Sequence, residues 1–188
     1  LMSMEFTVDA VNKNLKELVH KYPDKFYAMA DIDTNNSIEN MKKNLIKAIE
    51  EYKLNGLKIH PNNTGMNVDD DYNVALLEEF NKYGLPVFIH SYPNSKDDRS
   101  ATYRVKYLVN KFPNIKFIIS HMGAYQYEDL LDTNCYVDIS AILPDYVNKF
   151  GIKETNNILR KFGPERLIFA TDYPSSRCLV PEEIYDRY

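Results

Sequence analysis

The chain has 188 residues, of which 44% are hydrophobic, and a formal net charge of -4. This is enough apolar material for one globular domain with a substantial core, which we expect to span residues 1–188. Acidic and basic residues are interspersed, without the basic block that favours nucleic acid or a membrane surface, and no apolar run approaches the roughly 18 residues of a bilayer span. We therefore expect neither nucleic acid nor a membrane as a partner.

The ends of the chain and its cysteines bear on location. The first residues lack a basic segment followed by an apolar one, so no secretory signal is visible. The two cysteines, Cys135 and Cys178, do not form the pattern of a disulfide framework. We expect a cytoplasmic protein, and because the sequence starts at Leu1 we expect it to be part of a longer chain.

Amphipathic helical patterns alternate with short apolar runs. The first helical pattern spans Val8 to His20, and the later ones cover residues 40–52, 72–83, 101–112 and 145–162. The predicted strands are short and rich in Ile, Val and Phe, as buried parallel strands are, and cover residues 26–32, 57–60, 87–90, 117–121, 136–140 and 167–172. Alternation of this kind predicts βαβ units and an α/β fold with a parallel sheet.

The spacing of the strand ends favours a barrel. Asp31, His60, His90 and His121 are separated by 29, 30 and 31 positions, and Ser140 and Asp172 by 32. A (β/α)₈ barrel of about 250 residues allots about 31 residues to each unit, so this chain holds about six of eight units. An open doubly wound sheet also accommodates six strands, but the Gly-rich first turn that usually accompanies it is absent. We therefore predict an incomplete TIM-barrel-like fold.

Ionisable or polar residues end strand after strand, and in barrels the active site lies at these C-terminal ends. His90, His121 and Asp172 are the strongest candidates, because imidazole and carboxylate are good ligands for zinc and similar divalent ions. A metal with an open position lowers the pKa of bound water to about 7.

Three neighbouring residues are candidates for substrate binding. His60 either caps its strand before Pro61 or lines the pocket. Lys58 has the same facing as His60 by strand alternation, so it either neutralises an anionic substrate or lies in a buried ion pair. Tyr92 closely follows His90, although most tyrosines here are expected to be packing residues.

Four segments together resemble the amidohydrolase-related family, the branch of the amidohydrolase superfamily that includes aminocarboxymuconate-semialdehyde decarboxylase. The segments are Gly56-Leu57-Lys58-Ile59-His60-Pro61, Pro86-Val87-Phe88-Ile89-His90, Ile119-Ser120-His121-Met122-Gly123 and Ala170-Thr171-Asp172-Tyr173-Pro174. No one of them is specific, but the ordered set at barrel spacing is.

The resemblance implies a role for each rim residue. His90 is implied to be a metal ligand, and His121 a catalytic histidine that polarises or protonates the substrate. Asp172 is implied to contact the metal and to move a proton for its bound water, while His60 is implied to be a pocket residue. General acid–base chemistry and charge stabilisation require groups of these kinds.

One departure from the family pattern concerns the metal. The family's first strand carries a His-x-His pair that supplies two ligands, and no His-x-His occurs in this sequence. His90 and Asp172 alone are fewer than the three protein ligands usual for catalytic zinc. Either the rest of a longer enzyme supplies the other ligands, or a partner or second copy closes the barrel.

Three functions follow as hypotheses. The first is a metal-dependent hydrolase in which metal-activated water attacks an amide or ester-type bond of a small molecule. The second is a nonoxidative decarboxylase of a small aromatic or unsaturated acid that uses the same rim. The third is a catalytically inactive fragment. The cofactor expected for the first two is a divalent metal, with zinc as the default for these ligands.

Overall fold

Six parallel strands pair in the order in which they follow one another along the chain. The computed structural model describes residues 7–173. Its strands are β1 (Met29–Ala30), β2 (Gly56–Ile59), β3 (Val87–His90), β4 (Phe117–Ser120), β5 (Tyr136–Asp138) and β6 (Leu167–Ile168). In a doubly wound sheet the strand order reverses at a switch point, whereas here every strand pairs with its chain neighbours. The order therefore agrees with the barrel prediction and disagrees with the open-sheet alternative.

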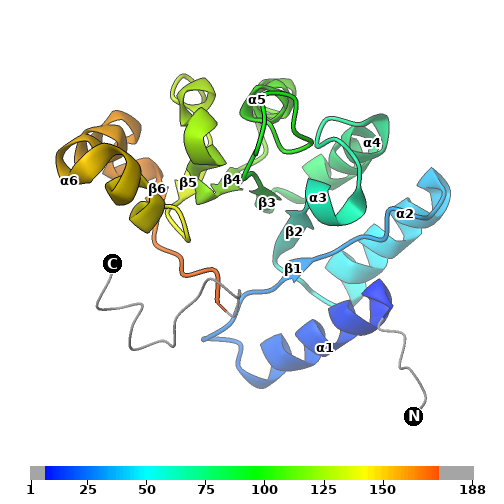
Figure 1. Cartoon of the computed structure of the whole chain (residues 1–188). Coiled ribbons are helices and arrows are strands. Elements are labelled where there is room, and N and C mark those ends of the chain that lie inside the picture. The colour runs from blue at the N-terminus through cyan, green and yellow to red at the C-terminus, as the bar shows by residue number, and fades with distance from the viewer. Residues whose placement is uncertain (1–6, 174–188) are drawn as a thin grey trace, which may run out of the picture.

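The helices lie between the strands, as the sequence patterns predict. They are α1 (Val8–Lys21), α2 (Ile38–Ile46) continued by η1 (Lys47–Glu51), α3 (Pro61–Thr64), α4 (Asp71–Phe80) continued by η2 (Asn81–Tyr83), α5 (Thr102–Lys111), η3 (His121–Leu130), α6 (Leu143–Phe162) and η4 (Pro164–Arg166). Figure 1 shows α2, α4, α5 and α6 arranged around one side of the sheet, with α1 beside β1. None of the helices between residues 7 and 173 is both long and apolar enough to cross a membrane.

The two faces of the sheet differ in burial. The residues that face the helices are at most 4% exposed: Leu57, Ile59, Val87, Ile89, Phe117, Ile119 and Val137. The alternate residues form a row across four strands through the pairs Lys58–Phe88, Phe88–Ile118 and Ile118–Tyr136, and all four are half-buried. The core therefore lies between sheet and helices, and the other face corresponds to the interior of a barrel.

The outermost described strands are shorter than the sequence predicts. For β1 the prediction began at Phe26, but Phe26 and Tyr27 are 44% and 76% exposed and only Met29–Ala30 pairs with β2. For β6 the prediction ran to Asp172, but pairing ends at Ile168 and Phe169 is 55% exposed. Apolar composition predicts a strand, whereas ladder pairing also requires a neighbouring strand, and within residues 7–173 these two strands have one neighbour each.

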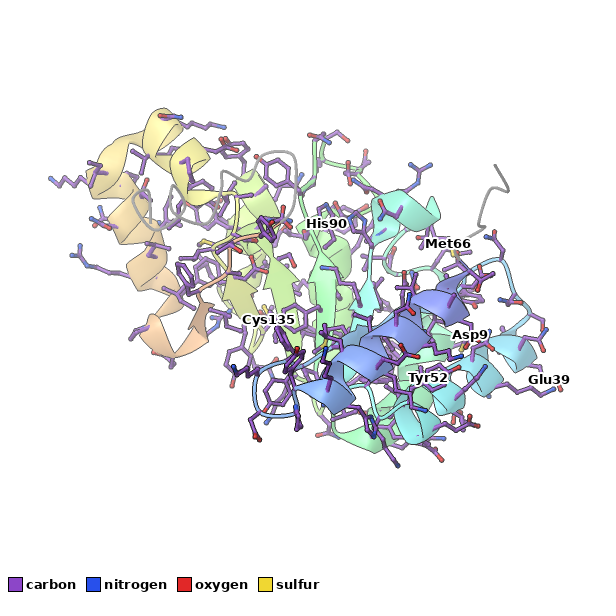
Figure 2. The ribbon with its side chains drawn as sticks, turned by 90° about the horizontal axis from the view of Figure 1, so that it is seen from below. Asp9, Glu39, Tyr52, Met66, His90 and Cys135 are labelled. Carbon is purple, nitrogen blue, oxygen red and sulfur yellow. The ribbon has the colours of Figure 1, made fainter. Side chains whose placement is uncertain are left out.

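Helix α1 covers the outer edge of β1 through Asn12. This side chain is 4% exposed; its Nδ2 donates to the carbonyl oxygen of Asp31 over 2.8 Å, and its Oδ1 accepts from the Asp31 backbone N–H over 3.1 Å. A second link joins α1 to η1 and the residue after it, because Asp9 accepts from Lys47 and from the Tyr52 hydroxyl. Figure 2 shows Asp9 and Tyr52 near one another on these elements. The amide of Asn12 thus completes hydrogen bonds that a further strand would otherwise make.

Candidate active site

A cavity of about 240 Å³ opens at the C-terminal ends of the strands. His90 and His121 lie where β3 and β4 end, and Figure 2 shows His90 and Cys135 toward opposite ends of the sheet. The lining residues come from several loops: Asn62, His90, Tyr92, Asn94, His121, Ala141 and Asp172. The structure therefore brings His90, His121, Asp172 and Tyr92 to one pocket, as the sequence analysis expected from the strand ends.

Three imidazoles and a phenol are packed together at this rim. The rings of His60 and His90 stack with centroids 3.9 Å apart and planes 9° apart. His121 meets His90 edge-on at 5.0 Å, and Tyr92 meets His121 at 5.8 Å. His60 is also the N-cap of α3, since its Nδ1 accepts from the Asn63 backbone N–H over 3.4 Å. His60 thus caps a helix and stacks on the ring of His90, but it is not among the residues that line the cavity.

His60 and His90 are held in the neutral form at this rim. Burial lowers the pKa of His90 to about 3, and the nearby His60, His121 and Lys58 act in the same direction. Burial and the charge of Lys58 lower the pKa of His60 as well. Neutral imidazole is the form that binds metal ions, because its unprotonated nitrogen has a free electron pair.

Lys58 lies below these rings rather than among the residues that line the cavity. Its Nζ donates to Ser120 Oγ over 3.2 Å. Burial lowers the pKa of Lys58, although the carboxylates of Asp138, Asp172 and Asp31 attract its charge. Of the three residues predicted for substrate binding, Tyr92 is in the cavity lining, while His60 and Lys58 are adjacent to it.

The sequence analysis missed Asp138, which contacts His121. It took Ser140 as the end of its strand, whereas β5 ends at Asp138. One oxygen of Asp138, Oδ1, accepts from the backbone N–H groups of His121 and Ser140, each over 3.0 Å, and from the Ser140 hydroxyl. Strand alternation could have found Asp138, because it lies two residues before Ser140 and so has the same facing. The same argument singled out Lys58, two residues before His60.

Three residues other than glycine at the cavity have backbone φ angles in the left-handed region. The φ angles are 60° at His121, 57° at Ala141 and 59° at Asp172, and all three residues line the cavity. Left-handed backbone costs roughly 1–2 kcal/mol for a residue other than glycine. Strain of this kind persists where surrounding contacts enforce it and is concentrated at functional sites.

The donors at this rim fit part of a divalent metal site. His90 is neutral, and Asp172 lines the same cavity, which are the donor types that such ions take. Among residues 7–173, however, no group of three His, Cys, Asp or Glu side chains is arranged to hold an ion. The described residues therefore offer an incomplete ligand set, in line with the absence of a His-x-His pair.

A parallel sheet in sequential order, with imidazoles and carboxylates at the C-terminal ends of its strands, defines a (β/α)-barrel protein with a site on one rim. The chain belongs to the amidohydrolase family, whose sequence model matches residues 3–177. This confirms the resemblance drawn from the four segments.

A curated relative adds a named activity. The chain is 22% identical over 202 aligned positions to 2-amino-3-carboxymuconate-6-semialdehyde decarboxylase of Dictyostelium discoideum. The match covers 87% of this chain and 55% of the relative. The chain thus spans about half the length of that protein.

Solved structures agree with the fold. A TIM-barrel protein of Bordetella bronchiseptica gives a TM-score of 0.74 at 19% identity, covering 94% of this chain and 63% of that one. A dihydroxybenzoic acid decarboxylase of Polaromonas, solved with manganese and 2-nitroresorcinol, gives 0.68 at 18% identity, covering 96% and 67%. A 5-carboxyvanillate decarboxylase of Sphingomonas paucimobilis gives 0.62 at 18% identity, covering 92% and 67%. The prediction of an incomplete TIM-barrel-like fold is confirmed.

Proposed function

We propose that the protein is a metal-dependent nonoxidative decarboxylase of a small aromatic or unsaturated carboxylic acid. The observation that carries the proposal is the joint presence of His90, His121 and Asp172 in one cavity at the strand ends. The named activity of the Dictyostelium relative, and those of the Polaromonas and Sphingomonas proteins, support the decarboxylase hypothesis over the hydrolase hypothesis that the sequence analysis put first.

In this proposal His90 and Asp172 hold the metal together with ligands from outside residues 7–173. Manganese in the Polaromonas structure makes manganese the first ion to test, while zinc, the default from ligand chemistry, stays a prediction. A divalent cation bound there supplies Lewis acidity that polarises oxygen atoms of the substrate. The possible homo-oligomer and the cytoplasmic location stay predictions too.

The residues around the cavity would divide the remaining work. Tyr92 offers an aromatic surface beside His121, and its hydroxyl donates to Asp145 over 2.6 Å. Lys58 lies below the rim; burial lowers its pKa, and in its protonated form it adds positive potential that favours an anionic substrate. In a decarboxylation the carbon–carbon bond to the carboxylate breaks, its electron pair stays on the remaining carbon, and that carbon takes a proton as CO₂ leaves. We assign the proton delivery to His121, since a positioned histidine contributes about 10²–10⁴-fold to such transfers.

The test is CO₂ release by the full-length protein loaded with manganese or zinc. The panel consists of hydroxylated benzoic acids, starting with 2,6-dihydroxybenzoate, and unsaturated dicarboxylic acids, with amides, esters and lactones as the hydrolase arm. We expect CO₂ and the decarboxylated product from at least one acid. His121→Asn should lower kcat by about 10²-fold or more, whereas His20→Asn, on the exposed side of α1, should change it little.

Metal content separates the alternatives further. About one tightly held ion per chain, lost in His90→Asn, agrees with the proposal. Hydrolysis of an amide or ester without CO₂ release from any acid would instead support the hydrolase hypothesis. Absence of both metal and turnover would support the inactive fragment.

A further inference from the structure

We propose that Asp138 and Ser140 fix His121 in the tautomer that has its proton on Nδ1, so that only Nε2 takes part in reactions at the cavity. Asp138 and Ser140 are thereby positioning residues, and neither is among the residues that line the cavity. The arrangement of protons stands on the contacts alone, while its catalytic consequence rests on the proposed function.

The contacts around Nδ1 of His121 are short and buried. Nδ1 lies 2.9 Å from the Ser140 carbonyl oxygen and 3.0 Å from Ser140 Oγ. His121, Asp138 and Ser140 are 4%, 4% and 2% exposed, so water does not compete for these positions. Such a buried polar group is costly unless it is paired with the correct partner.

The chemistry of the partners decides where the protons are. A carbonyl oxygen only accepts hydrogen bonds, and so does a carboxylate oxygen. Because the Ser140 hydroxyl donates its one proton to Asp138 Oδ1, its lone pairs remain to face His121. Nδ1 therefore faces two acceptors, and it satisfies them only when it carries the proton.

The opposite tautomer would be destabilised at the same atom. With its proton on Nε2, the lone pair of Nδ1 would point at two oxygen lone pairs, and the Ser140 hydroxyl would have to abandon Asp138 to relieve the repulsion. Asp138 makes that change costly, since its buried Oδ1 would lose the charge-assisted hydrogen bond from the Ser140 hydroxyl.

The same carboxylate fixes the direction of the ring. His121 has a φ of 60°, and Ala141, directly after Ser140, has a φ of 57°. By holding the backbone N–H groups at 3.0 Å each, Asp138 ties the end of β4 to the end of β5 in this strained conformation. A backbone in the ordinary helical or extended region would turn the imidazole away from Ser140.

For the proposed decarboxylation this arrangement defines a single path for the proton. Neutral His121 takes up a proton at Nε2, gives it to the carbon that loses CO₂, and returns to the neutral Nδ1–H form. A residue that holds one nitrogen of a catalytic histidine by hydrogen bonding fixes which tautomer the reaction meets.

The primary test is the tautomer of His121, read by nuclear magnetic resonance on ¹⁵N-histidine-labelled full chain at neutral pH. Correlations from the ring carbon-bound protons distinguish a protonated from an unprotonated ring nitrogen, and His121→Asn assigns the signals by their loss. We expect Nδ1 protonated and Nε2 unprotonated. Finding the proton on Nε2 overturns the proposal.

The isosteric variant Asp138→Asn tests whether Asp138 sets the tautomer. The amide oxygen of asparagine is a weaker acceptor than a carboxylate oxygen, so the Ser140 hydroxyl proton is held less strongly and turns toward Nδ1 more often, and the Nε2–H fraction should rise several-fold. The matched control is Asp129→Asn, because Asp129 also accepts from a hydroxyl, that of Thr102, over 2.7 Å. An unchanged His121 pattern in folded Asp138→Asn overturns the proposal.

Kinetics adds a readout that a purely structural role would not move. On a substrate identified by CO₂ release, Asp138→Asn should lower kcat by about 10²-fold with KM within a few-fold, and Asp129→Asn should leave both nearly unchanged. Ser140→Ala keeps the carbonyl acceptor and should lower kcat less than Asp138→Asn. If no acid is decarboxylated but the expected tautomer and its response to Asp138→Asn are observed, the proposed function fails and the assignment of protons stands.

Discussion

Replacing Asn12 by Leu should destabilise the fold through the edge of β1. Leucine has the same branching and the same number of side-chain heavy atoms as asparagine, so the change removes the two hydrogen bonds to the Asp31 backbone without leaving a cavity. Each such bond contributes about 1 kcal/mol net, which gives about 2 kcal/mol for the pair. Asp31 itself is exposed, so water reaches part of the freed backbone and keeps the cost below that of two fully buried groups.

The assay is equilibrium urea unfolding followed by circular dichroism. With a slope of about 2 kcal/mol per molar urea, the expected loss lowers the midpoint by about 1 M. Asn14→Leu is the matched control, because Asn14 lies in the same helix, is exposed, and undergoes the same change in helix propensity. Equal midpoints for the two variants would refute the idea that Asn12 replaces a neighbouring strand at this edge.

The remaining predictions concern the rim and its supports. Tyr146→Phe should cost about 1–2 kcal/mol in urea unfolding, because it leaves the buried Ala124 carbonyl, which accepts from Tyr146 over 2.6 Å, without this donor; a cost below 0.5 kcal/mol would contradict this. Ala141→Gly should raise the free energy of unfolding by about 0.5–1 kcal/mol, since relief of left-handed strain exceeds the added chain entropy of glycine; a loss of stability would count against the strain. Burial lowers the pKa of Lys58 from 10.5, so as the pH rises the folded state releases this proton before the unfolded state does. Between pH 7 and pH 10.5 the free energy of unfolding of the wild type should therefore increase relative to that of Lys58→Met. A difference that stays constant over this range would disprove the lowered pKa.

The regular spacing of the strands made most of the fold predictable from the sequence. Fully buried strands can be recognised by continuous apolar runs. Strand β2 ends one residue before the predicted His60, and β3 ends at the predicted His90. The edges of the described sheet were less predictable, because the residues of Phe26–Tyr27 have the composition of a strand but no burial to match. Helix α6 covers the helical pattern predicted for residues 145–162, and it is interrupted at Gly151, where φ is 77°.

The site residues that lie at or near the ends of strands could be predicted from the sequence. His90 ends β3, His121 directly follows β4 and Asp172 lies in the segment after β6, so parallel strands bring the three residues to one rim. Contacts that depend on the turns after the strands could not be predicted from the sequence. They include the hydrogen bond by which His60 caps α3 and the hydrogen bond from the His121 backbone N–H to Asp138. Left-handed backbone at a histidine has no signature in composition or periodicity. Cys178 and Pro174, which entered the sequence analysis, lie outside the described residues.

The sequential strand order has a consequence for how the protein folds. Every strand pairing joins segments roughly one βα unit apart, so the entropy lost in closing each loop is small and similar from one unit to the next. Growth can then spread outward from the four-residue ladder of β3 and β4 without waiting for any distant part of the chain. Sequential connectivity of this kind favours stepwise assembly of neighbouring units, each of which still has to close a loop of one βα unit before its strands pair.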